Sequence, residues 1–224
     1  MEQNLSKKTR TESDLIGSRE VPESALYGVQ TLRGIENFRI SKFHLNEYPL
    51  FIQALAITKM GAAVANRELD LLTEEQADAI LKACKEILEG KHHDQFPVDM
   101  IQGGAGTTTN MNANEVIANR ALELMGHQRG EYQYCSPNDH VNRSQSTNDA
   151  YPTAIHIGLY YTHLKLVKHF EVLIESFRKK ATEFAHVIKM GRTQLEDAVP
   201  MTLGQTFNGF ASILRHEVKN LDFA

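Results

Sequence analysis

Residues 152–188 read PTAIHIGLYYTHLKLVKHFEVLIESFRKKATEFAHVI, and this run bears most directly on the architecture. Its apolar residues step by threes, fours and one seven, at Ile155, Leu159, Leu166, Phe170, Leu173, Phe177, Ala181, Phe184 and Ile188. This spacing predicts a single helix with one apolar stripe, roughly 50 Å long at ~1.5 Å per residue. A helix of that length has to pack along partners of similar length, which predicts a helix bundle.

The rest of the chain does not supply enough long helices to complete such a bundle. A later helix is expected from about Leu203 onward, and no stop signal follows residues 218–221. We therefore expect the N-terminal part of a longer bundle protein, with a natural end in a frayed helix as the alternative. The expected fold class is mainly α, with a helical N-terminal domain over residues 1–145 and the incomplete beginning of a long central helix bundle over residues 146–224.

Upstream of the long helix, the pattern predicts shorter helices. One spans residues 50–69, and the next begins at the capping box of residues 73–76 and ends before Gly90. Another runs from about Asn110 to Met125 and is closed by Gly126. The residues before these helices are expected to form an irregular lead-in, with short strands around residues 19–21 and 27–31.

Composition excludes several classes of protein. The chain has 224 residues, is 42% hydrophobic, and carries 24 basic against 28 acidic residues, a net charge of −4. This balance argues against a binder of nucleic acid or of a membrane surface, and the apolar stretch 51–69 is too interrupted by polar residues to span a membrane. Cys84 and Cys135 form neither a disulfide framework nor a zinc motif. With no secretory signal visible in residues 1–17, a reducing, cytoplasmic location is expected.

Two polar segments at predicted helix starts have the chemistry of ligand sites. Residues 102–110 read QGGAGTTTN, where glycines let backbone N–H groups approach a ligand at a helix N-terminus, which suits an anion. By itself this segment is explained at least as well by an N-capped helix after a flexible loop. In residues 144–149, SQSTND, the side chains of Ser146, Thr147 and Asn148 can all donate to a carboxylate. Capping would use only one or two of these groups.

A similar donor set occurs in residues 191–194, GRTQ, for which a turn is the default interpretation. Together the segments offer neutral donors, which suit a dicarboxylate. A carbanion beside a carboxylate becomes a doubly charged aci-carboxylate, so donors aimed at it bind it more tightly as the proton leaves. No general base accompanies these donors. The ten histidines are dispersed, without metal-site spacing, and are expected to be solvated or packed.

These segments resemble the aspartase/fumarase superfamily. The likeness rests on GGAGT and NMNANEV between residues 103 and 116, on SQSTND at 144–149 and on KMGRTQ at 189–194, and it extends over nearly all of the chain from residue 17 onward. Within the superfamily the chain is most similar to the aspartase branch. Gln194 and Ser136 stand where fumarases usually have histidine. The resemblance implies the reversible elimination of ammonia from L-aspartate to give fumarate, without an organic cofactor and sometimes with activation by a divalent metal.

The resemblance also implies roles for particular residues. The side chains expected to bind substrate carboxylates are those of Thr107, Ser146, Thr147, Asn148 and Thr193. The family's base is a serine in a mobile loop reading roughly Gly-Ser-Ser-x-Met-Pro, and no Ser-Ser pair occurs in this sequence. We therefore expect no catalytic residue in this span, a base C-terminal to Ala224, and an isolated chain that is inactive. The family assembles as a homotetramer whose active sites are each built from three subunits.

Two alternatives remain open at this point. A class II fumarase, which interconverts malate and fumarate, would use the same donor chemistry. A non-catalytic truncated subunit, or an interaction module, would instead use the unfilled apolar stripe of its long helix.

Overall fold

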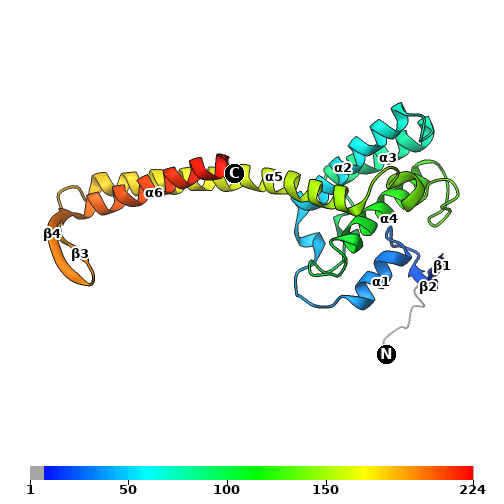
Figure 1. Cartoon of the computed structure of the whole chain (residues 1–224), viewed down its shortest axis with the longest axis horizontal. Coiled ribbons are helices and arrows are strands. Elements are labelled where there is room, and N and C mark those ends of the chain that lie inside the picture. The colour runs from blue at the N-terminus through cyan, green and yellow to red at the C-terminus, as the bar shows by residue number, and fades with distance from the viewer. Residues whose placement is uncertain (1–7, 224) are drawn as a thin grey trace. The chain divides into compact units, whose positions relative to one another are not determined.

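The computed structural model describes residues 8–223, which form mainly helices in two compact units (Figure 1). The first unit extends to Leu159 and the second begins at Tyr160. The expected domain boundary after residue 145 stays a prediction. The first residues of the expected lead-in, 1–7, and Ala224 lie outside the described residues. Within the described residues, no helix combines the length and the apolar character that crossing a membrane requires.

The chain begins with a β-hairpin. Strand β1 (Thr9–Asp14) pairs antiparallel with β2 (Gly17–Pro22), with Asp14 opposite Gly17 at the tight turn. The strand expected around residues 19–21 is thereby confirmed inside β2. The strand expected around residues 27–31 is wrong, because helix α1 (Val29–Asn37) begins there.

A buried carboxylate from a distant helix explains why α1 forms. The side chain of Glu115 accepts hydrogen bonds from the backbone N–H groups of Gly28, Gln30 and Thr31, at 2.8, 2.8 and 3.0 Å. The first N–H groups of a helix have no partner within it, and an acceptor at this end also suits the helix dipole. Tertiary contact with the helix that carries Glu115, α4 (Thr107–Leu124), therefore overrides the β-forming side chains of this segment.

Helices α2 (Pro49–Glu68), α3 (Glu74–Leu88) and α4 (Thr107–Leu124) build the core of the first unit, and Figure 1 shows them beside one another. The 3-10 helix η1 (Leu45–Glu47) precedes α2, the 3-10 helix η2 (His93–Gln95) lies between α3 and α4, and the π-helix η3 (Pro137–Val141) follows α4. The expected capping box is confirmed, because the Thr73 hydroxyl accepts from the N–H of Gln76 while the Gln76 side chain accepts from the N–H of Thr73. Gly90 and Gly126 have φ values of 88° and 83°, as expected for glycines that close a helix.

The core is apolar and closely packed. The largest buried aliphatic side chains come from all three helices, and each is no more than 1% exposed: Ile52, Leu55, Ile80, Ile87, Ile117 and Leu122. Burying one such side chain contributes roughly 1.5–3 kcal/mol. This packed core supports two loops, residues 102–106 before α4 and residues 142–146 after η3.

Helix α5 (Thr147–Glu183) is the predicted long helix, and its 37 residues correspond to about 55 Å. It begins earlier than the sequence suggests, because Pro152 is not its first residue but lies inside its second turn. It also ends earlier, since Ile188 opens a strand. The hairpin of β3 (Ile188–Thr193) and β4 (Glu196–Thr202) follows, and then α6 (Leu203–Phe223), which begins at the predicted residue.

The second unit is an antiparallel helix pair closed by this hairpin (Figure 1). Phe177 and Phe184 of α5 contact Phe207 of α6 with ring centroids 6.1 and 5.8 Å apart. His163 lies 3.0 Å from the carboxylate of Asp222. This pair is the beginning of the bundle that the sequence predicts.

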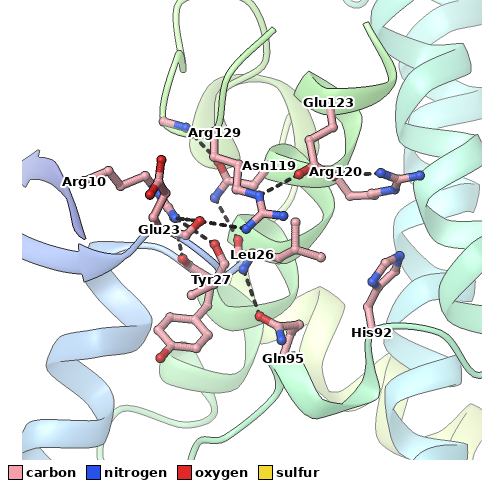
Figure 2. Close-up of polar contacts among 12 residues, drawn as sticks. Arg10, Glu23, Leu26, Tyr27, His92, Gln95, Asn119, Arg120, Glu123 and Arg129 are labelled. Atoms are coloured by element: carbon pink, nitrogen blue, oxygen red, sulfur yellow. Dashed lines mark hydrogen bonds and ion pairs between the residues drawn. The ribbon is translucent and has the colours of Figure 1, made fainter. Parts of the chain in front are cut away.

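Figure 2 shows how polar groups fasten the lead-in to the helices of the first unit. The Arg10 guanidinium donates to the backbone oxygens of Ala25 and Tyr27 at 2.7 and 2.8 Å. The Asn119 amide of α4 donates to the Leu26 oxygen at 2.7 Å, and the N–H of Leu26 donates to the Gln95 side chain at 2.8 Å. Irregular backbone is tolerated here because each of these buried polar groups has a partner.

Candidate functional site

The first two polar segments meet in the first unit. The amide nitrogen of Asn110, in the first turns of α4, lies 3.2 Å from the Thr147 hydroxyl, at the first residue of α5. A side chain on Gly106 would overlap the ring of Tyr151, so the glycine loop lies directly against α5. The sequence expectation that residues 102–110 and 144–149 act together is consistent with this contact.

The glycine loop ends in a run of left-handed backbone. Gly104, Ala105 and Gly106 have φ values of 77°, 48° and 89°. The Thr107 hydroxyl donates to the Gly104 oxygen at 2.6 Å, so in this arrangement its proton closes the loop. To donate to a ligand, this hydroxyl has to rotate away from the loop.

Part of the expected anion site at α4 is occupied by the protein's own groups. The side-chain oxygen of Gln102 accepts from the N–H of Thr109 at 2.8 Å, while its amide nitrogen donates to the Thr109 hydroxyl at 2.7 Å. The next N–H, that of Asn110, donates to the Gly106 oxygen. Capping therefore explains these donors, as the simpler interpretation of this segment requires.

The second segment combines capping with donor chemistry. The Ser146 hydroxyl accepts from the N–H of Asn148 at 3.2 Å, and the Asp149 carboxylate accepts from the N–H of Ser146 at 3.3 Å, so both side chains cap the start of α5. Because the hydroxyls of Ser146 and Thr147 both accept hydrogen bonds from the protein, each keeps its proton for a ligand oxygen. The Ser146 and Asn148 side chains are exposed, and that of Thr147 is half-buried.

Thr193 lies in the second unit, at the end of β3, and its side chain is exposed. It pairs with Glu196 across a two-residue turn, Gln194 and Leu195, with φ values of 52° and 68°. The turn expected over residues 191–194 therefore begins only at Gln194, because residues 191–193 belong to β3. The structure brings Thr147 close to the glycine loop, with Ser146 and Asn148 beside Thr147 in the chain, whereas Thr193 belongs to the second unit.

Lys59 is a candidate site residue that the sequence does not single out. In the sequence it is only one of the polar residues that interrupt the apolar stretch 51–69. Its ammonium group contacts the side-chain oxygens of Asn110, Asn142 and Gln145 beneath the second segment. The sequence feature that could have identified it is a lysine in the middle of a mostly apolar helix. An unpaired lysine is rarely tolerated there, so a buried lysine implies a set of partners.

Three further titratable groups, those of Cys84, Cys135 and His140, are packed inside the first unit. Burial raises the pKa of the free thiols Cys84 and Cys135 to about 12, which makes both unreactive. Burial lowers the pKa of His140, whose Nδ1 accepts from the N–H of Ser136 at 2.7 Å as a packed histidine does. Among residues 8–223, no three His, Cys, Asp or Glu side chains gather in a way that could hold a metal ion.

A pocket of about 1050 Å³ lies against the network of Figure 2, and its lining includes Arg10, Glu123 and Arg129 but none of the predicted site residues. The Arg129 guanidinium donates to the Glu123 carboxylate at 2.6 Å and to the backbone oxygen of Glu23 at 2.8 Å. The guanidinium groups of Arg10 and Arg129 already have partners, so hydrogen-bond chemistry favours the Ser146–Thr147 region over this pocket.

Comparisons with known proteins show what the chain as a whole is similar to. Residues 17–224 match the model of a protein family described as Lyase. The aspartate ammonia-lyase of Escherichia coli strain K12 is 56% identical over 218 residues, which are 97% of this chain and 46% of that protein. The aspartate ammonia-lyase of Pseudomonas fluorescens is 58% identical over 212 residues, covering 95% of this chain and 44% of that protein.

Solved structures give the same result for the fold. A crystal structure of fumarate lyase:delta crystallin from Brucella melitensis, bound to cobalt, is 52% identical with a TM-score of 0.93, over 96% of this chain and 47% of that one. Recombinant class II fumarase from Schistosoma mansoni is 38% identical with a TM-score of 0.84, over 95% of this chain and 44% of that one. The chain spans about half the length of the curated relatives it matches.

Proposed function

The chain belongs to the lyase family, and from this we propose that it supplies carboxylate-binding residues of an aspartate ammonia-lyase. In the proposed reaction a base removes a proton from the CH2 carbon of L-aspartate, next to the carbon that carries the amino group, and the carboxylate attached to that CH2 carbon becomes an aci-carboxylate. The carbon–nitrogen bond then breaks, ammonia leaves and fumarate remains. The reverse reaction adds ammonia to fumarate.

The observation that carries this proposal is the state of the hydroxyl groups of Ser146 and Thr147. Both accept from the protein and keep a proton for a ligand oxygen. A neutral donor aimed at a carboxylate gains strength as that carboxylate takes up a second charge, so it stabilises the transition state more than the bound substrate. Asn148, Thr107 and Thr193 are proposed to complete the donor set, with Thr107 first releasing its bond to the Gly104 oxygen.

We further propose that the general base is not among these 224 residues, which contain no Ser-Ser pair. On that basis the isolated chain is inactive, and the complete protein works in the cytoplasm as a homotetramer that needs no organic cofactor. The residues described here then bind and orient the substrate.

Class II fumarase is the second candidate, because the fold is also similar to that of the Schistosoma mansoni enzyme. Gln194 and Ser136, where the fumarase branch usually has histidine, favour aspartate over malate. The two are separated by giving the complete protein either aspartate or malate and following the absorbance of fumarate. Fumarate formation from malate with no response to aspartate would reverse the assignment.

The binding role is tested with Thr147→Val in the complete protein. Loss of one such donor is expected to lower the turnover of aspartate on the order of 10²–10³-fold, whereas Thr147→Ser retains most of the activity. Thr182→Val, at an exposed threonine of the same helix that bonds only within it, is the matched control. Ammonia release at the unaltered rate from Thr147→Val would refute the role of this hydroxyl.

A further inference from the structure

Lys59 is the largest fully buried side chain of the described residues. It lies near the middle of α2 and its side chain is 0% exposed. Burying an ammonium group is costly unless a carboxylate or a set of hydrogen-bond acceptors compensates for the lost hydration. The groups that compensate for the lost hydration of Lys59 therefore indicate its role in the structure.

All the partners of Lys59 are neutral amide oxygens. The ammonium nitrogen lies 2.7 Å from the Asn110 oxygen, 2.9 Å from the Asn142 oxygen and 3.0 Å from the Gln145 oxygen. Three acceptors match the three N–H donors of an ammonium group. In the described part of the chain, no Asp or Glu side chain forms an ion pair with this nitrogen, so its charge is solvated but not neutralised.

Asn110 transmits the contact to Thr147. Because the amide oxygen of Asn110 faces the Lys59 ammonium group, its amide nitrogen has to face the other way. That nitrogen lies 3.2 Å from the Thr147 hydroxyl oxygen and 3.1 Å from the Asn142 oxygen. The Thr147 hydroxyl must accept this bond, which leaves its only proton for a ligand.

The same ammonium group also holds the loop before Ser146. The Gln145 amide nitrogen donates to the Val141 oxygen at 3.0 Å, and the Asn142 amide donates to the backbone oxygen of Gln145, also at 3.0 Å. Both side chains present their oxygens to Lys59. About two turns later on α2, the Asn66 amide donates to the backbone oxygen of Arg143 at 2.9 Å. The loop is therefore anchored to α2 at two places.

Resting on the proposed function, we propose that Lys59 is a positioning residue for substrate binding. Its ammonium group fixes the Asn110 amide and the 142–145 loop, so that the Thr147 hydroxyl donates to a substrate carboxylate. Its uncompensated charge also favours a dianionic ligand at the site, because a positive charge surrounded by protein is screened much less than one in water. Burial lowers the pKa of Lys59 to about 7, which agrees with a cation that lacks a counter-ion in the ligand-free protein.

The test is Lys59→Met in the complete protein, which removes the charge and keeps the approximate shape. We expect kcat/KM for aspartate to fall by about 10²-fold, the size of effect that misplacing a catalytic group can produce. Arg67→Met is the matched control, since it removes a cation from the same helix that contacts only the exposed carboxylates of Glu74 and Asp78. It is expected to leave kcat/KM unchanged.

A double-mutant cycle separates positioning from mere stabilisation of the fold. If Lys59 acts through Thr147, Lys59→Met has a much smaller effect in the Thr147→Val background than in the wild type. If the fold-losses in kcat/KM of the two single variants multiply in the double variant, as they do for two independent sites, the proposal is overturned. An unchanged kcat/KM in Lys59→Met would also overturn it.

Asn110→Asp provides a second route if Lys59→Met does not fold. This variant keeps the shape and gives Lys59 a carboxylate partner, but it removes the nitrogen that donates to Thr147. A thermal midpoint at or above the wild-type value together with a similar loss of kcat/KM would support positioning, and full activity would overturn it. If the wild type acts on aspartate but the variants are unimpaired, only the role of Lys59 fails. A wild type that acts on neither aspartate nor malate would remove the proposed function, and with it the role of Lys59.

Discussion

Ser146 and Thr147 illustrate how the partners of one hydroxyl group decide its use. Each accepts a hydrogen bond from within the protein, so each retains a proton that can be donated outward. The Thr107 hydroxyl is in the opposite state, because it donates to the Gly104 oxygen. All were equivalent in the sequence, where only the type of side chain could be read. Their different roles arise from neighbours that the sequence does not place.

Asp99 provides a prediction at the scale of a single residue. Burial by itself would raise its pKa, but hydrogen bonds from the Ser41 hydroxyl and from backbone N–H groups outweigh burial and lower the pKa from 3.8 to about 2. The Ser41 hydroxyl donates to one carboxylate oxygen of Asp99 at 2.7 Å, and the Ser41 N–H donates to the other, also at 2.7 Å. These bonds join the segment after α1 to the segment before α4.

Because the folded state lowers this pKa, the ionised Asp99 stabilises the protein above pH 3.8, and that contribution is lost as the pH falls towards about 2. We expect Asp99→Asn to be less stable at neutral pH and to show a weaker loss of stability over this acid range. Denaturant unfolding at a series of pH values measures both effects. Parallel pH profiles for variant and wild type would contradict this assignment.

At the scale of the element, α1 is the case in which local pattern misleads. The side chains of residues 27–31 suit a strand, yet the carboxylate of Glu115 on α4 accepts the first N–H groups of a helix there. By contrast, the start of α3 depends on two residues close together in the chain, Thr73 and Gln76, and the sequence predicts it correctly. Helix α5 falls between these cases: its apolar stripe predicts its existence, whereas its first residues depend on the capping hydrogen bonds of Ser146 and Asp149.

The packing of α1 on α4 leads to a paired glycine prediction. A side chain at Gly34 would overlap the Thr108 methyl group, whereas one at Gly61 of α2 would meet nothing within 4 Å. We expect Gly34→Ala to destabilise the protein by about 1–3 kcal/mol, as overpacking does. Gly61→Ala is expected to stabilise it by about 0.5–1 kcal/mol, because alanine is the better helix former.

Equilibrium unfolding in urea measures both variants against the wild type. The pair is internally controlled, since each replaces a helical glycine by alanine. Equal stability changes in the two variants would show that the contact between α1 and α4 is looser than described.

At the scale of the whole molecule, the second unit leaves much apolar surface uncovered. Val172 of α5 and Ile213 of α6 are 70% and 61% exposed, and other large apolar side chains of the pair are also exposed. Two antiparallel helices cannot bury an apolar surface of this kind by themselves, so they require further helices. This agrees with the bundle that the stripe of residues 152–188 predicts.

We therefore expect the chain to self-associate through the helix pair of the second unit. Val172→Lys combined with Ile213→Lys is predicted to weaken this association, because a charge in an apolar interface loses its hydration. Glu171→Lys, at a neighbouring exposed position, is the control. Light scattering after size-exclusion chromatography measures the mass, and a monomeric wild type at all concentrations would count against this expectation.

The sequence by itself determined the long amphipathic helix, the capped start of α3, the position of α6 and the two donor segments that meet at Thr147. These features are local, because spacing, capping and side-chain chemistry are set by residues close together in the chain. Only the tertiary structure decided that residues 27–31 start a helix, that Thr107 is engaged by its own loop, and that Lys59 lies beneath the site. Each depends on contacts with residues that are remote in sequence or on loop geometry, and the free energies of such contacts exceed the differences in local propensity.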